Sequence, residues 1–100
     1  PPEPGPVEIR VLFKPAVLRW ARESRPMGFV GEEEHPDGVV MVFRPRNYRD
    51  LVPWILSWGP ADLVLSPPSL RAEIRTAARA VAELYGALQE SSVVKEGDAR

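Results

Sequence analysis

Residues 54–74 read WILSWGPADLVLSPPSLRAEI, and this stretch decides the fold. Apolar residues at helical spacing come first and end at Gly59, a residue that suits the left-handed conformation closing many helices. The proline that follows prevents continuation, and residues 61–65 predict a short strand. Ser66 is a plausible N-cap for a further helix, which opens at the two prolines after it. The stretch therefore predicts a helix, a strand and a second helix in close succession.

The helices on either side of that strand extend the pattern in both directions. Asn47 or Asp50 can cap the first helix, and Pro53 favours the later cap because proline is tolerated only in the first turn. The second helix carries an apolar seam along about five turns, with spacings that alternate between four and three. The residues of this seam are Leu70, Ile74, Ala77, Val81, Leu84 and Leu88. Beyond the seam, residues 91–100 are expected to form a disordered tail.

The first half of the chain adds three strands and a helix. Residues 7–13 alternate between two faces, as a half-buried strand does, and Pro15 suits the first position of a helix that continues to Ser24. Residues 27–35 and 38–44 are strand-like runs joined by an Asp-Gly hairpin signal. The order predicts an α+β fold, a ferredoxin-like βαββαβ antiparallel sheet with an additional C-terminal helix. Right-handed crossovers would place both crossover helices on one face of this sheet.

Three tryptophans follow the helical spacing of these segments. Trp20 shares one side of the first helix with Val17, and Trp54 and Trp58 belong to the helix before the glycine. Tryptophan rings stack on bases in some nucleic-acid-binding proteins, but regular spacing with other apolar residues favours burial in a core. We therefore expect all three rings to pack against the sheet.

The composition fits one small globular domain. The chain has 100 residues, of which 44% are hydrophobic, and its net charge is −1. It has no cysteine, which excludes disulfides, thiolate metal sites and cysteine nucleophiles. No apolar run reaches the roughly 18 residues of a membrane span and no signal peptide is recognisable, so we expect a cytoplasmic protein. Residues 1–6, rich in proline, are expected to be a linker from a missing upstream domain, and residues 7–90 the domain itself.

The order and spacing of several motifs resemble the C-terminal extension (WCX) domain of WYL-domain-containing bacterial transcriptional regulators. In that family a helix ends in WLLSFG or similar, the next strand reads VLEP, and the helix after it opens with ELREEL. The corresponding residues here are WILSWG at 54–59, VLSP at 64–67 and SLRAEI at 69–74. The opening VEIRVLFKPAVLRWARE at 7–23 is similar to the family's first strand and helix, so the resemblance spans residues 7–88.

This resemblance implies an accessory module of a regulator that has an N-terminal winged helix-turn-helix and a central WYL domain sensing a ligand. In some members the ligand is single-stranded DNA, and the extension contributes to dimerisation or borders the ligand site. The implied partners are a second copy, the upstream WYL and helix-turn-helix domains of the same polypeptide, and a single-stranded nucleic acid effector. Because the chain lacks those domains and the Trp-Tyr-Leu signature, we expect no duplex DNA binding. It has no glycine-rich phosphate loop and no catalytic constellation, so we expect no cofactor and no enzymatic activity.

Two groups of arginines are candidate contacts for an effector or a partner. One lies at the turn between the third strand and the following helix, where guanidinium groups can bind a phosphate or an acidic surface. The other repeats every four residues along the last helix and therefore shares one side of it. A solvated turn and a salt-bridged outer face are the respective alternatives. The groups are Arg44, Arg46 and Arg49, and Arg71, Arg75 and Arg79.

The third strand supplies candidate interface residues, namely Val40, Met41 and Val42. Both of its faces are apolar, whereas a solvated antiparallel face normally alternates with polar residues. We therefore expect the sheet face opposite the crossover helices to be covered. A partner chain or the WYL domain is one cover, and the seam of the last helix is the other.

No catalytic or metal-binding group is expected. Residues 32–35, three glutamates and a histidine, point alternately to opposite faces of a strand and so do not form a metal site. Glu8 and Glu23 have no neighbouring nucleophile to activate. An RNA-recognition domain would need a basic-Gly-aromatic motif that the third strand lacks, and an acylphosphatase-like enzyme would need an arginine at residues 14–16. An RNA-binding or small-molecule-binding regulatory module of the same fold stays as the alternative function.

Overall fold

The computed structural model describes the backbone of residues 7–99 and the side chains of residues 7–88. Four strands and three α-helices follow one another in the order that the sequence predicts, with two short 3-10 helices around α2. The elements are β1 (Ile9–Phe13), α1 (Pro15–Glu23), β2 (Phe29–His35), β3 (Gly38–Phe43), η1 (Tyr48–Leu51), α2 (Val52–Ser57), η2 (Gly59–Ala61), β4 (Asp62–Ser66) and α3 (Pro68–Ala99). The predicted ferredoxin-like α+β fold with a C-terminal helix is confirmed.

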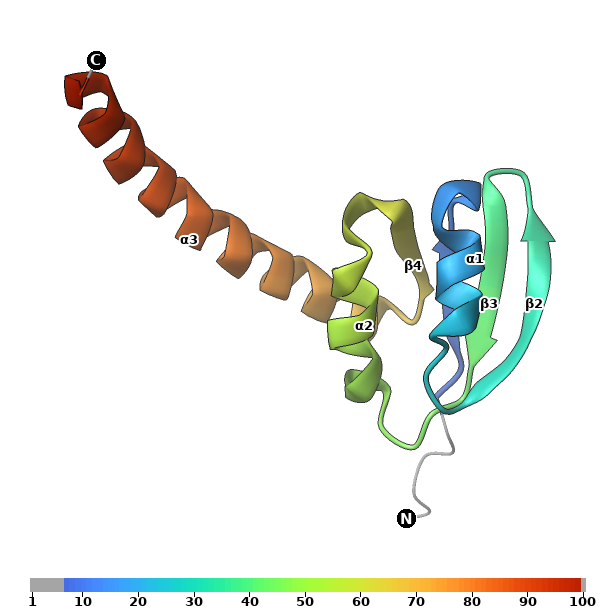
Figure 1. Ribbon diagram of the computed structural model, residues 1–100. Coiled ribbons are helices and arrows are strands. Elements are labelled where there is room, and N and C mark those ends of the chain that lie inside the picture. Colours follow the sequence, from blue (N-terminus) through green and yellow to red (C-terminus); the bar gives the residue numbers. More distant parts are fainter. Residues whose placement is uncertain (1–6, 100) are drawn as a thin grey trace, which may run out of the picture.

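The four strands form one antiparallel sheet in the order β2-β3-β1-β4. Val11 at the centre of β1 lies between Met41 of β3 and Val64 of β4. The two crossover helices, α1 and α2, cover one face of the sheet, as Figure 1 shows. Two layers result, with the core between the helices and the sheet.

The core on the helix side is rich in aromatic rings. The ring of Phe13 lies 5.2 Å from that of Trp54, and the ring of Phe43 lies 5.6 Å from it. Trp54 is half-buried and donates its Nε1 hydrogen to the hydroxyl of Ser24 at 3.1 Å. Trp58, also half-buried, packs edge-on against Trp54. Burial of these two tryptophans against the core is therefore confirmed in part, since each keeps some contact with solvent.

The prediction that Trp20 is buried is wrong. Its side chain is 56% exposed, whereas the next residue, Ala21, is fully buried. Val17, Ala21 and Leu18 lie within about 100° of one another around α1 and face the core, whereas Trp20 lies about 100° from Ala21 on the side away from Leu18. The small alanine allows α1 to approach the sheet closely, while Val17 and Leu18 supply its larger core contacts.

The start of the second crossover differs from the expected single helix. Asn47 is the residue that caps, because its Oδ1 accepts a hydrogen bond from the amide of Arg49 at 3.0 Å and opens η1. The later cap at Asp50, which Pro53 favoured, is therefore wrong. The 3-10 turn accommodates the proline, which falls in the first turn of α2. Gly59 has φ 58°, the left-handed conformation predicted for the end of the helix.

Among the described side chains of α3, those that anchor the helix to the domain lie at its base. Leu70 is fully buried and Ile74 packs against the core, whereas Val81, Leu84 and Leu88 are 52%, 66% and 59% exposed. The helix starts at Pro68, and Ser66 is the last residue of β4 and not a helix cap. Its 32 residues span about 48 Å, and Figure 1 shows the outer part running away from the sheet.

The predicted disordered tail and linker lie at the two ends of the described chain. The helical backbone includes residues 91–99, where the sequence predicts a disordered tail, and that tail stays a prediction. The predicted linker at residues 1–6 lies outside the described residues, as does Arg100.

Candidate interaction surfaces

The sheet face without helices carries a small apolar cluster of its own. Val40 and Val42 from β3 and Leu12 from β1 form it, with Leu65 of β4 packed against them. The two valines are 3% and 7% exposed. Met41 is fully buried in the helix-side core, because alternate residues of a strand point to opposite faces. Met41 is therefore not available for an interface, and α3 does not cover the cluster, since its seam packs on the other side of the sheet.

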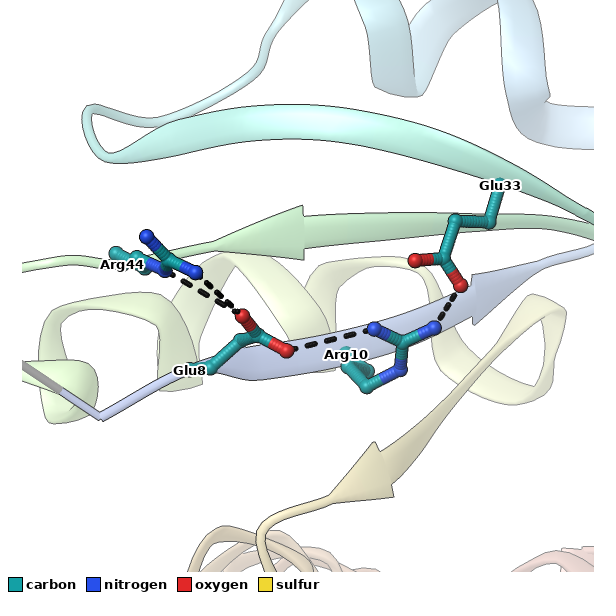
Figure 2. Close-up of polar contacts among 4 residues, drawn as sticks. All are labelled: Glu8, Arg10, Glu33 and Arg44. Carbon is teal, nitrogen blue, oxygen red and sulfur yellow. Dashed lines mark hydrogen bonds and ion pairs between the residues drawn. The ribbon is translucent and has the colours of Figure 1, made fainter.

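A row of charged side chains lies across this face (Figure 2). Arg44 donates to Glu8 at 3.0 Å, Glu8 contacts Arg10 at 3.4 Å, and Arg10 pairs with Glu33. The hydrogen bond from Arg44, with a smaller contribution from Arg10, holds the pKa of Glu8 below its usual value. Long side chains cover apolar surface with their methylene stems, so this row explains why the valines are shielded. The apolar face is thus smaller than the sequence suggests.

The three arginines of the strand-to-helix turn do not converge on one site. Arg44 is held by Glu8, and Arg49 donates from Nε to Glu73 at 3.0 Å, which ties η1 to α3. Arg46 makes no ion pair among the residues whose side chains are described, and it lines a hollow of about 320 Å³ with Asp50. Two of these arginines therefore form exposed ion pairs within the chain, and Arg46 is the one of the three without such a pair among the described side chains.

Two arginines of α3, unlike those of the turn, lie beside a groove. Arg71 and Arg75 lie one turn apart beside a groove of about 490 Å³, whose apolar side is formed by Leu63, Val64 and Ile74. Within residues 7–88 neither arginine makes an ion pair with a carboxylate. The salt-bridged face that the sequence offered as the alternative is not formed by these two arginines, because Glu73 pairs with Arg49 of η1 instead.

The groove continues toward the outer part of α3. A second hollow of about 350 Å³ shares Leu63, Val64 and Ile74 with the first and reaches Val81. This groove was not predicted from the sequence, which predicted residues 61–65 as a short strand without placing α3 beside it. The apolar run of β4 could have indicated this exposed surface. Val64 lies in the core, whereas Leu63 and Leu65 lie on the open side of an edge strand.

One carboxyl group lies in the groove wall. Asp62 faces Phe13 across the β1–β4 ladder, and burial raises the pKa of Asp62 to about 7. Its Oδ2 atom is buried without a hydrogen-bond partner among the described residues, as is Nε1 of Trp58. A charged carboxylate is poorly solvated at such a site, so the proton is retained at pH values where an exposed aspartate has released it.

Two other features of the described residues bear on function. No group of three His, Asp or Glu side chains in this part of the chain could hold a metal ion, and Glu32 is instead paired with Arg22 at 2.7 Å. The hydrogen bonds from Arg22 lower the pKa of Glu32. Across the same part of the chain, no helix has the length and apolar character that crossing a membrane requires.

Comparison with known proteins gives one result. The family model of the WCX domain matches residues 5–82, in agreement with the resemblance of the helix–strand–helix motifs. No curated protein and no solved structure matches the chain. WCX domains are accessory domains of WYL-type transcription regulators, and the family is regulatory. The match covers most of the chain, which therefore belongs to the WCX domain family.

Proposed function

We propose that this chain contributes to the dimerisation of a WYL-type transcription regulator and to its response to an effector. The observation that carries the proposal is the uncovered part of the α3 seam, from Val81 to Leu88. A regulatory accessory domain acts through contacts with other domains or copies, so its exposed apolar and basic surfaces are the places to look for function.

The exposed seam has the form of a helix-pairing surface. Val81, Leu84 and Leu88 continue the alternation of four and three residues that begins at Leu70 and Ile74, the spacing of helices that pack along a common seam. Tyr85 beside them is 64% exposed. Each leucine buried in a partner stabilises an assembly by about 1.5–3 kcal/mol at full burial. A second copy of α3 offers the same apolar surface in return, as a symmetric dimer requires.

A charged substitution on the α3 seam tests its role in dimerisation. Leu84→Lys places an ammonium group in the paired surface, and we expect sedimentation velocity to show a monomer where the unmodified chain forms a dimer. The melting temperature of the monomer should be little changed, because Leu84 is exposed in the single chain. Val30→Lys is the matched control, since Val30 is 53% exposed on the remote strand β2. A dimer that withstands Leu84→Lys would contradict the role of the seam.

The effector role rests on Arg71 and Arg75 beside the groove. Two guanidinium groups that make no ion pair among residues 7–88, next to the exposed side chain of Leu63, suit a ligand that combines phosphate with an apolar or aromatic body. Single-stranded nucleic acid has this chemistry, because its bases are free to contact apolar side chains while its phosphates meet arginine. Duplex DNA lacks accessible base faces, and a net charge of −1 gives no general attraction to it.

Fluorescence anisotropy with labelled oligonucleotides tests the effector role. We expect the chain to bind a single strand more tightly than a duplex, and Arg71→Ala with Arg75→Ala to weaken binding. The slope of the logarithm of affinity against the logarithm of salt concentration should become shallower by about 0.7 for each phosphate that is no longer neutralised. Arg19→Ala is the control, because Arg19 is 81% exposed on α1 and far from the groove in sequence. If single strands do not bind, the nucleic acid effector is excluded and the small-molecule-binding alternative takes its place.

A further inference from the structure

The two edges of the sheet differ in how they are protected against pairing. β2 and β4 are the edge strands of the described sheet. Each edge strand has a register irregularity against its neighbour, after Phe29 in β2 and at Leu65 in β4. β2 also carries three consecutive glutamates, which discourage pairing with another strand. β4 carries Leu63, Val64 and Leu65 with no charge among them. Of the two edges, β4 is the one that resembles an interface.

The surroundings of β4 leave space for a further strand. In the described sheet β4 pairs with β1 on one side, so its other edge is open, and Leu63 on this strand is 53% exposed. Helix α3 starts directly after β4 and projects on the β4 side of the sheet, away from β2 (Figure 1). A chain seated against the edge of β4 would therefore lie beside α3.

We propose that β4 pairs antiparallel with β4 of a second copy, about a twofold axis at Val64. This inference rests on the proposed dimerisation and names the surface that accompanies the α3 seam. Antiparallel pairing about Val64 places Leu63 opposite Leu65 of the second copy, and Leu65 opposite its Leu63. Because Leu65 packs on the open-face cluster, the two clusters become continuous across the axis. The two four-stranded sheets become one sheet of eight strands.

The alternatives for edge pairing are less favourable. Pairing β2 with β2 of a second copy brings together two runs of glutamates, residues 32–34, and like charges across strands are destabilising. Pairing β2 with β4 is a head-to-tail contact, which leaves a free edge at each end and leads to open chains of molecules. In the pairing of β4 with β4, Asp62 lies opposite Ser66 of the second copy, so no carboxylate faces another, and the assembly closes after two copies.

The geometry of α3 supports the same partner. The helix leaves each domain on the β4 side, so in a dimer joined at β4 each α3 extends toward the other copy (Figure 1). The exposed seam residues Val81, Leu84 and Leu88 then face protein and no longer water. One twofold axis thus accounts for two separate exposed features, an unprotected strand edge and an uncovered helix.

Mixed cysteine variants test the register of this pairing. The chain has no cysteine of its own, so Leu63→Cys and Leu65→Cys each introduce the only thiol. Residues opposite one another on neighbouring antiparallel strands have Cβ atoms about 4.5–5.5 Å apart, close to the geometry of a disulfide. Two copies of the same position lie on a diagonal of roughly 7–8 Å, which is too far. With oxidised glutathione, the mixture should give a disulfide-linked dimer and each variant alone should not.

The outcomes separate this inference from the proposed function. A cross-linked dimer in the mixture of Leu63→Cys and Leu65→Cys supports the β4 pairing. As a control, a mixture in which Val30→Cys replaces either variant should give no cross-link. If the unmodified chain is a dimer that Leu84→Lys dissociates, but the mixture cross-links no more than either variant alone, the β4 pairing is wrong and the α3 seam stands. If the unmodified chain is a monomer at high micromolar concentration, both are overturned.

Discussion

The base and the outer part of α3 carry the same apolar spacing in different surroundings. Leu70 is fully buried between the sheet and α2, whereas Leu84, four turns further along, is 66% exposed. Hydrophobic periodicity therefore identifies the side of a helix that is buried in the native assembly, but it does not specify which element or molecule buries it. At the base the cover is the domain's own core. In the outer part it has to come from another molecule or domain, and we propose a second copy.

The largest difference is expected from truncating the same residue type at the two places. Leu70→Ala removes side-chain volume from a filled core and should lower the free energy of unfolding by about 2–5 kcal/mol. Leu84→Ala should change it by less than about 0.5 kcal/mol in the monomer, because an exposed side chain leaves no cavity. Urea denaturation at low protein concentration, followed by tryptophan fluorescence, measures both. Equal losses would show that the outer part is covered within the single chain.

The tryptophans allow the same comparison in the two crossover helices. Trp54 contacts Phe13 and Phe43 and donates a hydrogen bond to Ser24, so Trp54→Ala should cost about 2–3 kcal/mol. Trp20→Ala should cost little, because more than half of its side chain faces solvent. Thermal unfolding followed by circular dichroism distinguishes the two. A strongly destabilised Trp20→Ala variant would mean that this ring has a partner surface.

The pH dependence of stability should differ between the groove at the base of α3, where Asp62 is buried, and the exposed outer part of the helix. The unfolded chain releases this proton near pH 3.8, whereas burial keeps it on the folded protein up to about pH 7. The folded state then binds more protons between these values, so the contribution of Asp62 to stability falls as the pH rises from about 3.8 to about 7. Asp62→Asn should remove this slope, while Glu83→Gln on the outer part should leave it. A slope that persists in Asp62→Asn would assign it to another group.

The smallest effect concerns the ion pair that ties α3 to η1. Arg49→Ala removes a contact with Glu73 in which the arginine is largely exposed, and such pairs contribute about 0.2–1 kcal/mol. Chemical denaturation at low and high salt measures the effect, which should diminish as salt screens the pair. A destabilisation well above this range would mean that the buried Oε2 of Glu73 depends on the arginine.

The order of elements and the fold could be predicted from local sequence signals. The Asp-Gly hairpin, the glycine at 59 and the alternation of residues 7–13 each depend on nearby residues alone, and the structure confirms them. The exposure of Trp20 could not be predicted, because Val17, Trp20 and Ala21 share one side of the helix in the sequence, and only the fold shows that the sheet contacts the Leu18 edge of that side and not the Trp20 edge.

The surfaces were harder to predict than the fold. Val40, Met41 and Val42 form one apolar run in the sequence, but the pleat of the strand divides them between a core and a face shielded by Arg10 and Glu33. The charged row joins residues from different strands, and such pairs are not visible in the spacing of one segment. The groove beside β4 depends on the direction in which α3 leaves the sheet, which the seam does not specify.

Static light scattering over a dilution series tests most directly whether a second copy covers the outer part of α3. We predict that the unmodified chain has twice its monomer mass of 11.2 kDa at high micromolar concentration and approaches the monomer mass on dilution. Leu84→Lys should stay at the monomer mass throughout the series. A mass of 11.2 kDa for the unmodified chain at every concentration would contradict the proposed dimer.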